Sequence, residues 1–226
     1  MKKILEFPFS NKRNKHEEKL SFDDMMESMF EQDDDDDDCY EFDEFMEEFG
    51  NTVQGIRMLV LDVDGVLTDG TIYVGNDGEL FKGFNAKDGM GISYAMRNGI
   101  EVCIITGRKS EMVRRRAAEL GITCVMEGVH DKATALTEIA AAHRIALDEI
   151  AYIGDDLNDL APMSICGFSF APGDAVDAVI DFCDFVLINT GGNGAVREAI
   201  DLLLDAQGKL DSVIDSYINS GQGDRQ

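Results

Sequence analysis

The sequence predicts an α/β fold built on a doubly wound parallel sheet of the Rossmann-like kind. A continuous apolar run begins at Leu59, and runs rich in β-branched residues are typical of strands buried on both faces. Strand-like and helix-like segments then alternate over the rest of the chain. The first strand ends in two carboxylates, Asp62 and Asp64, which point to the same side of an extended chain. Gly65 follows at once and allows a close backbone turn.

The expected elements follow the first strand in a regular order. Residues 70–84 hold two short β-prone runs joined by Asn-Asp-Gly, which predicts a β-hairpin. Next come a helix that Asp88 caps and a buried strand over residues 101–105. The later expected elements are a helix carrying residues 114–116, a strand over 123–126, a helix from Lys132 to about His143, a strand over 150–153, a short helix, a strand over 168–170, a helix near Ala175, a strand around 185–188 and a closing helix from Ala195 into Leu210. This alternation indicates βαβ units.

The composition excludes several classes of partner. The 226 residues include 45 Asp and Glu against 20 Lys and Arg, and the resulting net charge of -25 repels nucleic acid and anionic membranes. No apolar stretch approaches the ~18 residues of a membrane span, and the start lacks a secretory signal. The five cysteines are scattered without a CxxC pair, which favours a reducing cytoplasm. Cys103 and Cys124 lie in apolar runs and are interpreted as small core residues.

Residues 1–55 differ in kind from the domain predicted over residues 56–226. They contain 18 acidic and 6 basic residues, including an unbroken run of aspartates at 33–38 that repels itself. Short amphipathic pieces lie on either side of this run. We expect an acidic, largely disordered extension, and a docking segment or a loose cation binder are the alternatives.

Polar residues follow several of the predicted strands. The carboxyl ends of parallel strands share one edge of the sheet, so residues far apart in the sequence meet in one crevice there. The oxygens of Asp62 and Asp155 suit a hard cation such as Mg²⁺. Lys132 and the Thr106 hydroxyl offer a phosphate a cation and a neutral donor. Phosphoryl transfer needs mainly positioning and charge neutralisation, which this set supplies.

The order of these motifs resembles that of the haloacid dehalogenase-like phosphohydrolases: Asp-x-Asp, then Thr, then Lys, then Gly-Asp-Asp-x-x-Asp. Within that superfamily, residues from about 57 to 218 are similar to the 3-deoxy-D-manno-octulosonate 8-phosphate phosphatase family. The matching strings are DVDGVLTDG at residues 62–70, IITGR at 104–108, GDDL at 154–157, GGNGAVRE at 191–198 and LDAQGKL at 204–210. The residues before 55 have no counterpart in this resemblance.

The resemblance implies roles for the acidic residues. Asp62 would attack phosphorus and form an aspartyl-phosphate. Asp64 would protonate the leaving sugar oxygen and then take a proton from the hydrolytic water. Mg²⁺ would be held by the Asp62 carboxylate, the Asp64 backbone carbonyl and Asp155, with Asp156 behind them. Asp159 would order the loop rather than bind the metal.

The resemblance also implies residues that bind the substrate. Thr106, Gly107 and Lys132 would bind the phosphoryl oxygens. Arg108 and Arg197 would face the carboxylate of a sugar acid, where a guanidinium fork binds well, or they are surface arginines at helix ends.

The spacing of the motifs leaves no room for the cap domain that larger relatives carry. In the family a hairpin from a neighbouring subunit of a homotetramer closes over the site, and we carry that expectation to residues 71–84 and to the stretch after Gln207. The expected substrate is 3-deoxy-D-manno-octulosonate 8-phosphate, an intermediate of lipopolysaccharide biosynthesis. Asn193 stands where arginine is expected, which leaves a nonulosonate 9-phosphate open. A non-catalytic oligomerisation module linked to sugar-acid activation is the remaining alternative.

Overall fold

The computed structural model describes residue 50 and residues 52–220. Nearly all of them belong to one compact unit, Asn51–Gln226. The predicted acidic extension, residues 1–55, falls almost wholly outside the described residues, and its disorder stays a prediction. None of the helices in the described part is long and apolar enough to cross a membrane.

The fold is organised around one sheet of six parallel strands. In spatial order these are β5 (Cys124–Glu127), β4 (Glu101–Thr106), β1 (Met58–Leu61), β6 (Ile150–Ile153), β7 (Phe168–Ala171) and β8 (Phe185–Val186). Numbered along the chain, this is the order 3-2-1-4-5-6 of a doubly wound sheet. The chain reverses its direction of travel between β1 and β6, so the switch point lies there. The predicted fold class is confirmed.

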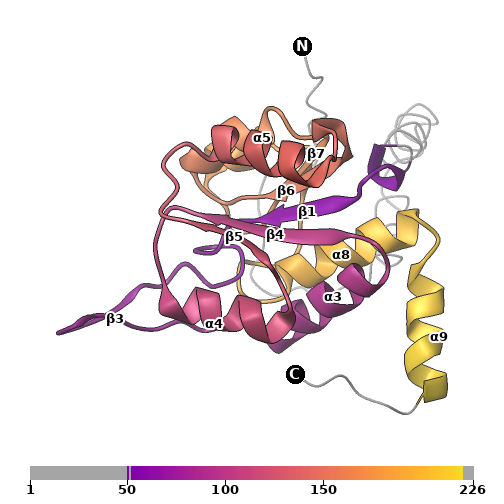
Figure 1. The fold of residues 1–226 in the computed structure, drawn as a ribbon, viewed down its shortest axis with the longest axis horizontal. Coiled ribbons are helices and arrows are strands. Elements are labelled where there is room, and N and C mark those ends of the chain that lie inside the picture. The colour runs from indigo at the N-terminus through magenta and orange to yellow at the C-terminus, as the bar shows by residue number, and fades with distance from the viewer. Residues whose placement is uncertain (1–49, 51, 221–226) are drawn as a thin grey trace, which may run out of the picture. The chain divides into compact units, whose positions relative to one another are not determined.

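Helices cover both faces of the sheet and bury its central strands. All four residues of β1 and all four of β6 are buried, as expected for a parallel sheet covered on both sides. On one face lies α5 (Lys132–His143), and on the other lie α3 (Ala86–Arg97), α4 (Glu111–Leu120) and α8 (Ala195–Ala206) (Figure 1). Shorter helices complete the connections: η2 (Leu147–Glu149), η3 (Leu157–Asp159), α6 (Leu160–Met163) and α7 (Asp177–Ile180).

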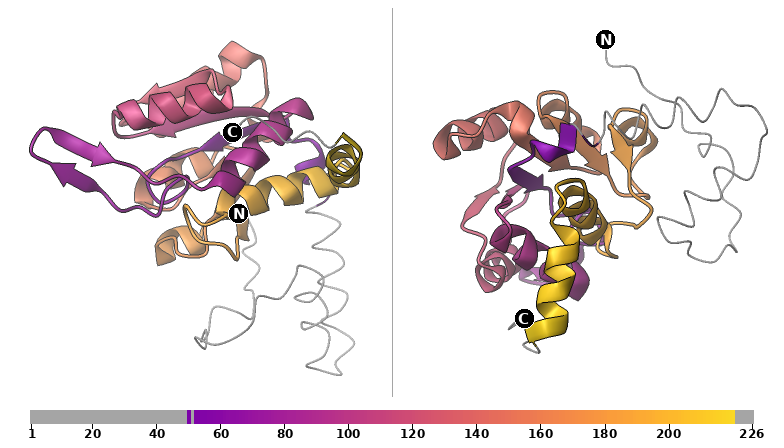
Figure 2. Two further views of the ribbon diagram at one scale, coloured as in Figure 1. Left: turned by 90° about the horizontal axis from the view of Figure 1, so that it is seen from below. Right: turned by 90° about the vertical axis from the view of Figure 1, so that its right-hand side faces the viewer.

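The predicted hairpin is present as a separate two-stranded antiparallel sheet. Its strands are β2 (Tyr73–Gly75) and β3 (Gly78–Phe81), and the rings of Tyr73 and Phe81 stack at 4.1 Å. The hairpin projects away from the main sheet in both Figure 1 and Figure 2. Its large apolar side chains are exposed: Ile72, Tyr73, Val74, Leu80 and Phe81. Its function as a flap stays a prediction.

Two predicted details of the helices are wrong. Asn85, not Asp88, caps α3 by accepting a hydrogen bond from Lys87 N at 2.8 Å. Asp88 is buried in the first turn and instead accepts from Arg197 N at 2.8 Å, so it caps the first turn of α8. The closing helix is also two helices, α8 and α9 (Leu210–Ser220), because Gly208 between them adopts a φ of +63°.

Candidate active site

Two of the predicted carboxylates meet at the switch point of the sheet. Asp62 directly follows β1, and Asp155 lies two residues beyond β6. The two strands are neighbours, with Leu61 paired to Ile153, and Asp62 N donates to Ile153 O at 3.1 Å. One carboxylate oxygen from each of Asp62, Asp155 and Asp159 lies within 4.8 Å of the others. The fold thus brings the predicted metal-binding acids together.

Lys132 supplies the positive charge inside this acidic cluster. It is the first residue of α5, and its side chain is fully buried. Its Nζ lies 2.7 Å from Asp159 Oδ1 and 3.1 Å from Asp62 Oδ1. Burial alone would lower the pKa of Lys132, but the charges of the two carboxylates raise that pKa above its ordinary value. The lysine therefore stays a cation, because a buried ammonium without these partners would be costly.

Asp159 orders the loop that carries Asp155. Its Oδ1 accepts from Lys132 and from the buried Tyr152 hydroxyl at 2.7 Å. Its Oδ2 accepts from Asp155 N at 3.2 Å. Both oxygens thus accept hydrogen bonds within the protein, and the prediction that Asp159 does not bind the metal stays a prediction. The part played by Tyr152 was missed, since a tyrosine on a buried strand gives no signal of which acid its hydroxyl reaches.

The donor set of this cluster fits a hard divalent cation. Asp62 Oδ1 and Asp155 Oδ1 are buried and lack an aligned hydrogen-bond donor, although Asp62 Oδ1 keeps its ion pair with Lys132. Burial, followed by the charge of Asp159, raises the pKa of Asp62 to about 7. Burial, followed by the charge of Asp62, raises the pKa of Asp155 to about 8. Crowded carboxylates whose buried oxygens lack aligned hydrogen-bond donors are the environment that Mg²⁺ relieves.

The turn after β1 depends on Gly65. Its φ is +94°, and a Cβ at this position would collide with the Asp155 carboxylate. Thr68 holds the turn together: its hydroxyl donates to Val63 O at 3.2 Å and accepts from Gly65 N at 3.4 Å. The absence of a side chain at residue 65 therefore lets the loop after β1 approach the Asp155 carboxylate.

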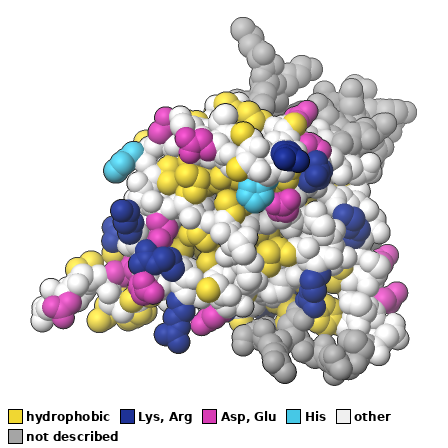
Figure 3. All heavy atoms as spheres, viewed as in Figure 1, with side chains coloured by type: hydrophobic (Ala, Val, Ile, Leu, Met, Phe, Trp, Pro, Cys, Tyr) yellow, Lys and Arg dark blue, Asp and Glu magenta, His cyan; other side chains and the backbone are white. Residues whose placement is uncertain are grey.

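Asp64 lies beside the cluster and is joined to the hairpin. Its Oδ1 accepts from Lys82 Nζ, and its Oδ2 lies 3.7 Å from Arg108 Nε. The side chain of Lys82 is 2% exposed, and its Nζ also pairs with Glu79 Oε1 at 3.2 Å. Figure 3 shows basic, acidic and apolar side chains together where the hairpin projects. Lys82 was missed from the sequence, because a lysine in a predicted hairpin gives no sign of burial.

The remaining predicted site residues occupy the loops at this edge. Thr106 ends β4 and is buried, whereas Gly107 and Arg108 are exposed on the loop that follows. Asp156 is exposed and caps η3, accepting from Leu157 N at 2.7 Å. Their roles toward a metal or a substrate stay predictions.

Arg197 is held by contacts within the domain. Its Nε donates to the Asp201 carboxylate at 2.8 Å, one turn further along α8. Its guanidinium also lies over the Tyr94 ring, 4.9 Å from the centroid. These contacts differ from the alternative of a surface arginine, since Arg197 is half-buried, and substrate binding by Arg197 stays a prediction.

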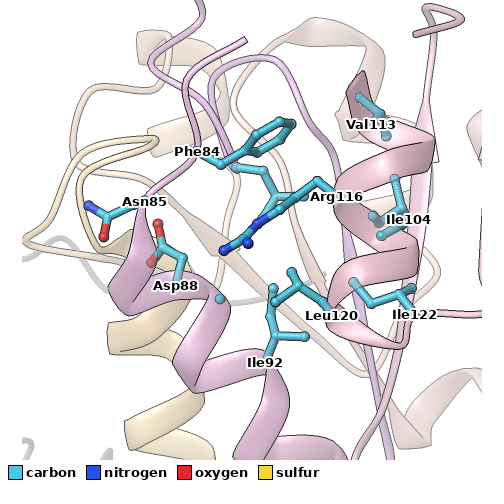
Figure 4. A pocket seen from close by; sticks show the side chains of 12 residues that line it. Phe84, Asn85, Asp88, Ile92, Ile104, Val113, Arg116, Leu120 and Ile122 are labelled. Atoms are coloured by element: carbon cyan, nitrogen blue, oxygen red, sulfur yellow. The ribbon is translucent and has the colours of Figure 1, made fainter. Parts of the chain in front are cut away.

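A separate small pocket lies between α3 and α4 (Figure 4). Its volume is about 10 Å³, room for a single water, and its lining is mainly apolar. The Arg116 guanidinium extends into it toward the side of Asp88. None of the residues of the acidic cluster lines this pocket, and it is far too small for a sugar phosphate.

Comparison with known proteins identifies the family. Residues 123–200 match the haloacid dehalogenase-like hydrolases. The chain is 51% identical over 158 residues to 3-deoxy-D-manno-octulosonate 8-phosphate phosphatase KdsC of Escherichia coli (strain K12), which covers 70% of this chain and 84% of the relative. The chain belongs to this phosphatase family. The resemblance drawn from the motifs is therefore confirmed.

Solved structures of the family share the fold. The 3-deoxy-D-manno-octulosonate 8-phosphate phosphatase of Moraxella catarrhalis has a TM-score of 0.74 at 40% identity, over 76% of this chain and 99% of that one. That structure is a complex with magnesium, phosphate and a KDO molecule. The cobalt-bound phosphatase of Haemophilus influenzae has a TM-score of 0.72 at 40% identity, with the same coverage of both chains.

Proposed function

We propose that this chain is a Mg²⁺-dependent phosphatase that hydrolyses 3-deoxy-D-manno-octulosonate 8-phosphate. The observation that carries the proposal is the meeting of Asp62 and Asp155 beside Lys132, with one buried oxygen on each acid that lacks an aligned hydrogen-bond donor. The family membership points to the same reaction. A scaffold without catalytic activity needs none of these buried charges, which argues against an oligomerisation module.

In the proposed reaction Asp62 is the nucleophile, and Asp64 is the general acid and then the general base. The Asp62 carboxylate attacks phosphorus, and the bond from phosphorus to the sugar oxygen breaks. Asp64 gives its proton to that leaving oxygen and then takes a proton from the water that hydrolyses the aspartyl-phosphate. Lys82 and Arg108 contact the two oxygens of Asp64 and so hold it in position.

The cation and the buried lysine neutralise charge. Mg²⁺ would be held by the carboxylates of Asp62 and Asp155 and the backbone carbonyl of Asp64, with Asp156 behind them. When bound, it supplies positive charge to the phosphoryl oxygens. Lys132 and the hydroxyl of Thr106 bind those oxygens from the protein side, together with the backbone of Gly107.

The identity of the sugar depends on the residues around the phosphate site. The local cations Lys82, Lys132 and Arg108 attract the anionic substrate despite the net charge of -25. Asn193 replaces an expected arginine, and its amide donates to Thr190 Oγ1 at 3.0 Å and Gly191 O at 3.1 Å. The absence of a cation at this position leaves a nonulosonate 9-phosphate open as the second candidate substrate.

Phosphate release from a panel of sugar phosphates tests the proposal. We expect the highest kcat/KM with 3-deoxy-D-manno-octulosonate 8-phosphate, loss of activity in EDTA and recovery with Mg²⁺. Higher kcat/KM with a nonulosonate 9-phosphate would transfer the proposal to that substrate. Activity that persists in EDTA would contradict the assignment of Mg²⁺.

The exposed hairpin supports a proposal about assembly. A projecting strand pair with five exposed large apolar residues is costly in water unless a partner covers it. We propose a homotetramer in which each hairpin closes over the site of a neighbour. Light scattering should give four chains per particle, and Val74→Asp should dissociate it; a monomeric wild type would contradict this.

We also propose that residues 56–226 are sufficient for activity and that the enzyme works in the cytoplasm. Cys103, Cys124 and Cys183 are free thiols, which fits a reducing compartment. Removal of residues 1–54 should leave kcat/KM within about twofold, since every proposed site residue lies between residues 56 and 226. A large change in the rate or in the oligomer would favour the docking alternative for this segment.

A further inference from the structure

A second group of metal-ligand side chains lies in the domain, and it contains no carboxylate ligand. Cys103 comes from β4, Cys124 from β5 and His143 from the last turn of α5. One ligand atom of each lies within 4.8 Å of the others. The two cysteines are direct partners in the pairing of β4 with β5, so their side chains leave the sheet next to each other.

The topology places this group away from the acidic cluster. Helix α5 starts with Lys132 in that cluster and ends at His143, eleven residues further on. At about 1.5 Å per residue, the two ends are separated by about 16 Å. The end of α5 meets the amino-terminal half of β4, because His143 contacts Glu101, the first residue of that strand. The cysteine and histidine group therefore does not share ligands with the phosphatase site.

A carboxylate orients the imidazole of this group. His143 Nδ1 lies 2.5 Å from Glu101 Oε2, and Glu101 is two residues before Cys103 on the same face of β4. With Nδ1 engaged, Nε2 is the ring nitrogen that remains for a metal. A carboxylate behind the second nitrogen is the usual arrangement of a metal-binding histidine, because it sets the tautomer and the ring orientation.

Burial and access also suit an ion at this place. Cys103 is fully buried within the core that α5 covers, whereas Cys124 and His143 are half-buried. The ligands are thus held by packing on one side and are open to solvent on the other. The sequence interpretation of both cysteines as core residues explains Cys103, but it does not explain why a histidine and a carboxylate gather beside the pair.

We propose that Cys103, Cys124 and His143 bind one Zn²⁺ ion per chain, with Glu101 positioning the imidazole. Two thiolates and one imidazole are the donors that Zn²⁺ takes in tetrahedral sites, with a fourth position left for water. The ion would join β4, β5 and the end of α5, so it would stabilise the folded chain. Mg²⁺ prefers oxygen ligands and does not compete for this set.

Cobalt titration of the full-length, reduced and metal-free protein tests the proposal, with Mg²⁺ in excess to fill the acidic cluster. Co²⁺ on thiolates gives a charge-transfer absorption and the intense visible bands of tetrahedral coordination, neither of which an all-oxygen site produces. We expect one equivalent of Co²⁺ to develop these bands and one equivalent of Zn²⁺ to abolish them. Zn²⁺ should also raise Tm by about 5 °C through linkage.

Variants separate the ligands from the rest of the chain. Cys124→Ser and His143→Gln should lower the affinity for Co²⁺ at least 100-fold, and Glu101→Gln should lower it about tenfold. Cys183→Ser, another free half-buried cysteine, is the matched control and should bind like wild type. Phosphatase activity with Mg²⁺ should be unchanged in Cys124→Ser, so this test is independent of the proposed function.

Three results would overturn the proposal. The first is the absence of thiolate bands in wild type, and the second is equal Co²⁺ affinity in the ligand variants and the control. The third is a Cys103–Cys124 disulfide that persists under reducing conditions. If a ligand variant fails to fold, alkylation of wild type decides instead: Zn²⁺ should protect Cys124 from iodoacetamide, and unprotected labelling would contradict the site.

Discussion

The two edges of the central sheet differ in how their polar side chains are held. At the carboxyl edge, Asp62 and Asp155 lie on loops that follow β1 and β6. At the amino-terminal half of β4, Cys103 and its partner Cys124 belong to regular strands. Helix α5 joins the two places, with Lys132 at its start and a histidine at its end. The comparison shows that one scaffold separates oxygen donors from sulfur and nitrogen donors.

The carboxyl edge also carries the greater electrostatic cost. Three buried or half-buried carboxylates, those of Asp62, Asp155 and Asp159, face one buried ammonium. Burial and mutual repulsion raise the pKa of two of these acids. The cysteine and histidine group instead places one carboxylate, that of Glu101, beside His143. Changes at the carboxyl edge should therefore affect both catalysis and folding, whereas changes at the other edge should spare catalysis.

The largest effect is expected from Asp62→Asn. The amide keeps the shape of the carboxylate but cannot attack phosphorus, so turnover should fall by about 10⁴-fold or more. Phosphate release under saturating substrate measures this, and circular dichroism checks that the fold is kept. Activity within tenfold of wild type would place the nucleophile elsewhere. It would also contradict the claim that catalysis depends on the carboxylates at the carboxyl edge.

Lys132→Met should have the largest effect on stability. It removes the only cation within 4 Å of Asp62 and Asp159 among the described residues and leaves both carboxylates buried without their partner. The free energy of unfolding, measured with urea in metal-free buffer, should fall by about 3–5 kcal/mol. Lys87 is exposed, and Lys87→Met is the control, which should change the free energy of unfolding by less than about 0.5 kcal/mol. Equal effects of the two changes would contradict the picture of a buried charge network.

Gly65→Ala tests the close approach of the loop after β1 to the Asp155 carboxylate. A methyl group at this position would displace the Asp155 carboxylate, and the residue would also be strained at its φ of +94°. Displacement of about 1 Å at a reacting centre lowers kcat about 100-fold. Gly55→Ala, where an added Cβ would make only an ordinary contact with Thr52 O at 3.6 Å, should keep wild-type kcat. Full activity in Gly65→Ala would show that the loop can move without loss of the site.

The smallest effect is expected at Asp88, which caps α8 near the carboxyl edge. Burial raises the pKa of Asp88 above its ordinary 3.8, so the folded state holds the proton where the unfolded state has lost it. Stability conferred by this group therefore falls as pH rises from 3.8 through the raised value. Asp88→Asn should keep the cap and flatten this slope in urea unfolding at several pH values. Asp88→Ala should also cost about 1 kcal/mol through loss of the cap.

A slope in Asp88→Asn equal to that of wild type would show that other groups titrate in this range. In that case the contribution of Asp88 would be limited to its hydrogen bond with Arg197 N.

The sequence was sufficient to predict the fold and the meeting of the principal acids. Asp62 and Asp155 each follow a strand with a continuous apolar pattern, and the carboxyl ends of parallel strands lie at one edge of the sheet. The predictions that were missed or wrong depended on contacts between residues far apart in the sequence. The burial of Lys82 needs Glu79 and Asp64 together, and the choice of Asn85 over Asp88 as a cap depends on α8. Such contacts have no local pattern.

The register between neighbouring strands also could not be predicted from the sequence. Cys103 and Cys124 lie in apolar runs, and their interpretation as core residues was reasonable for each run alone. Only the pairing of β4 with β5 shows that they are direct neighbours, and only the end of α5 places His143 beside them. The break between α8 and α9 at Gly208 was missed for a related reason, because an isolated glycine in an apolar pattern is tolerated within many helices.

Trapping the phosphoryl group on the enzyme tests the central claim most directly. The protein would be quenched during turnover with Mg²⁺ and 3-deoxy-D-manno-octulosonate 8-phosphate, and then treated with borohydride, which reduces an aspartyl-phosphate to homoserine. Mass spectrometry of the peptides should find homoserine at residue 62, and Asp62→Asn should yield none. Homoserine at another position, or an unmodified Asp62 during steady turnover, would contradict the account.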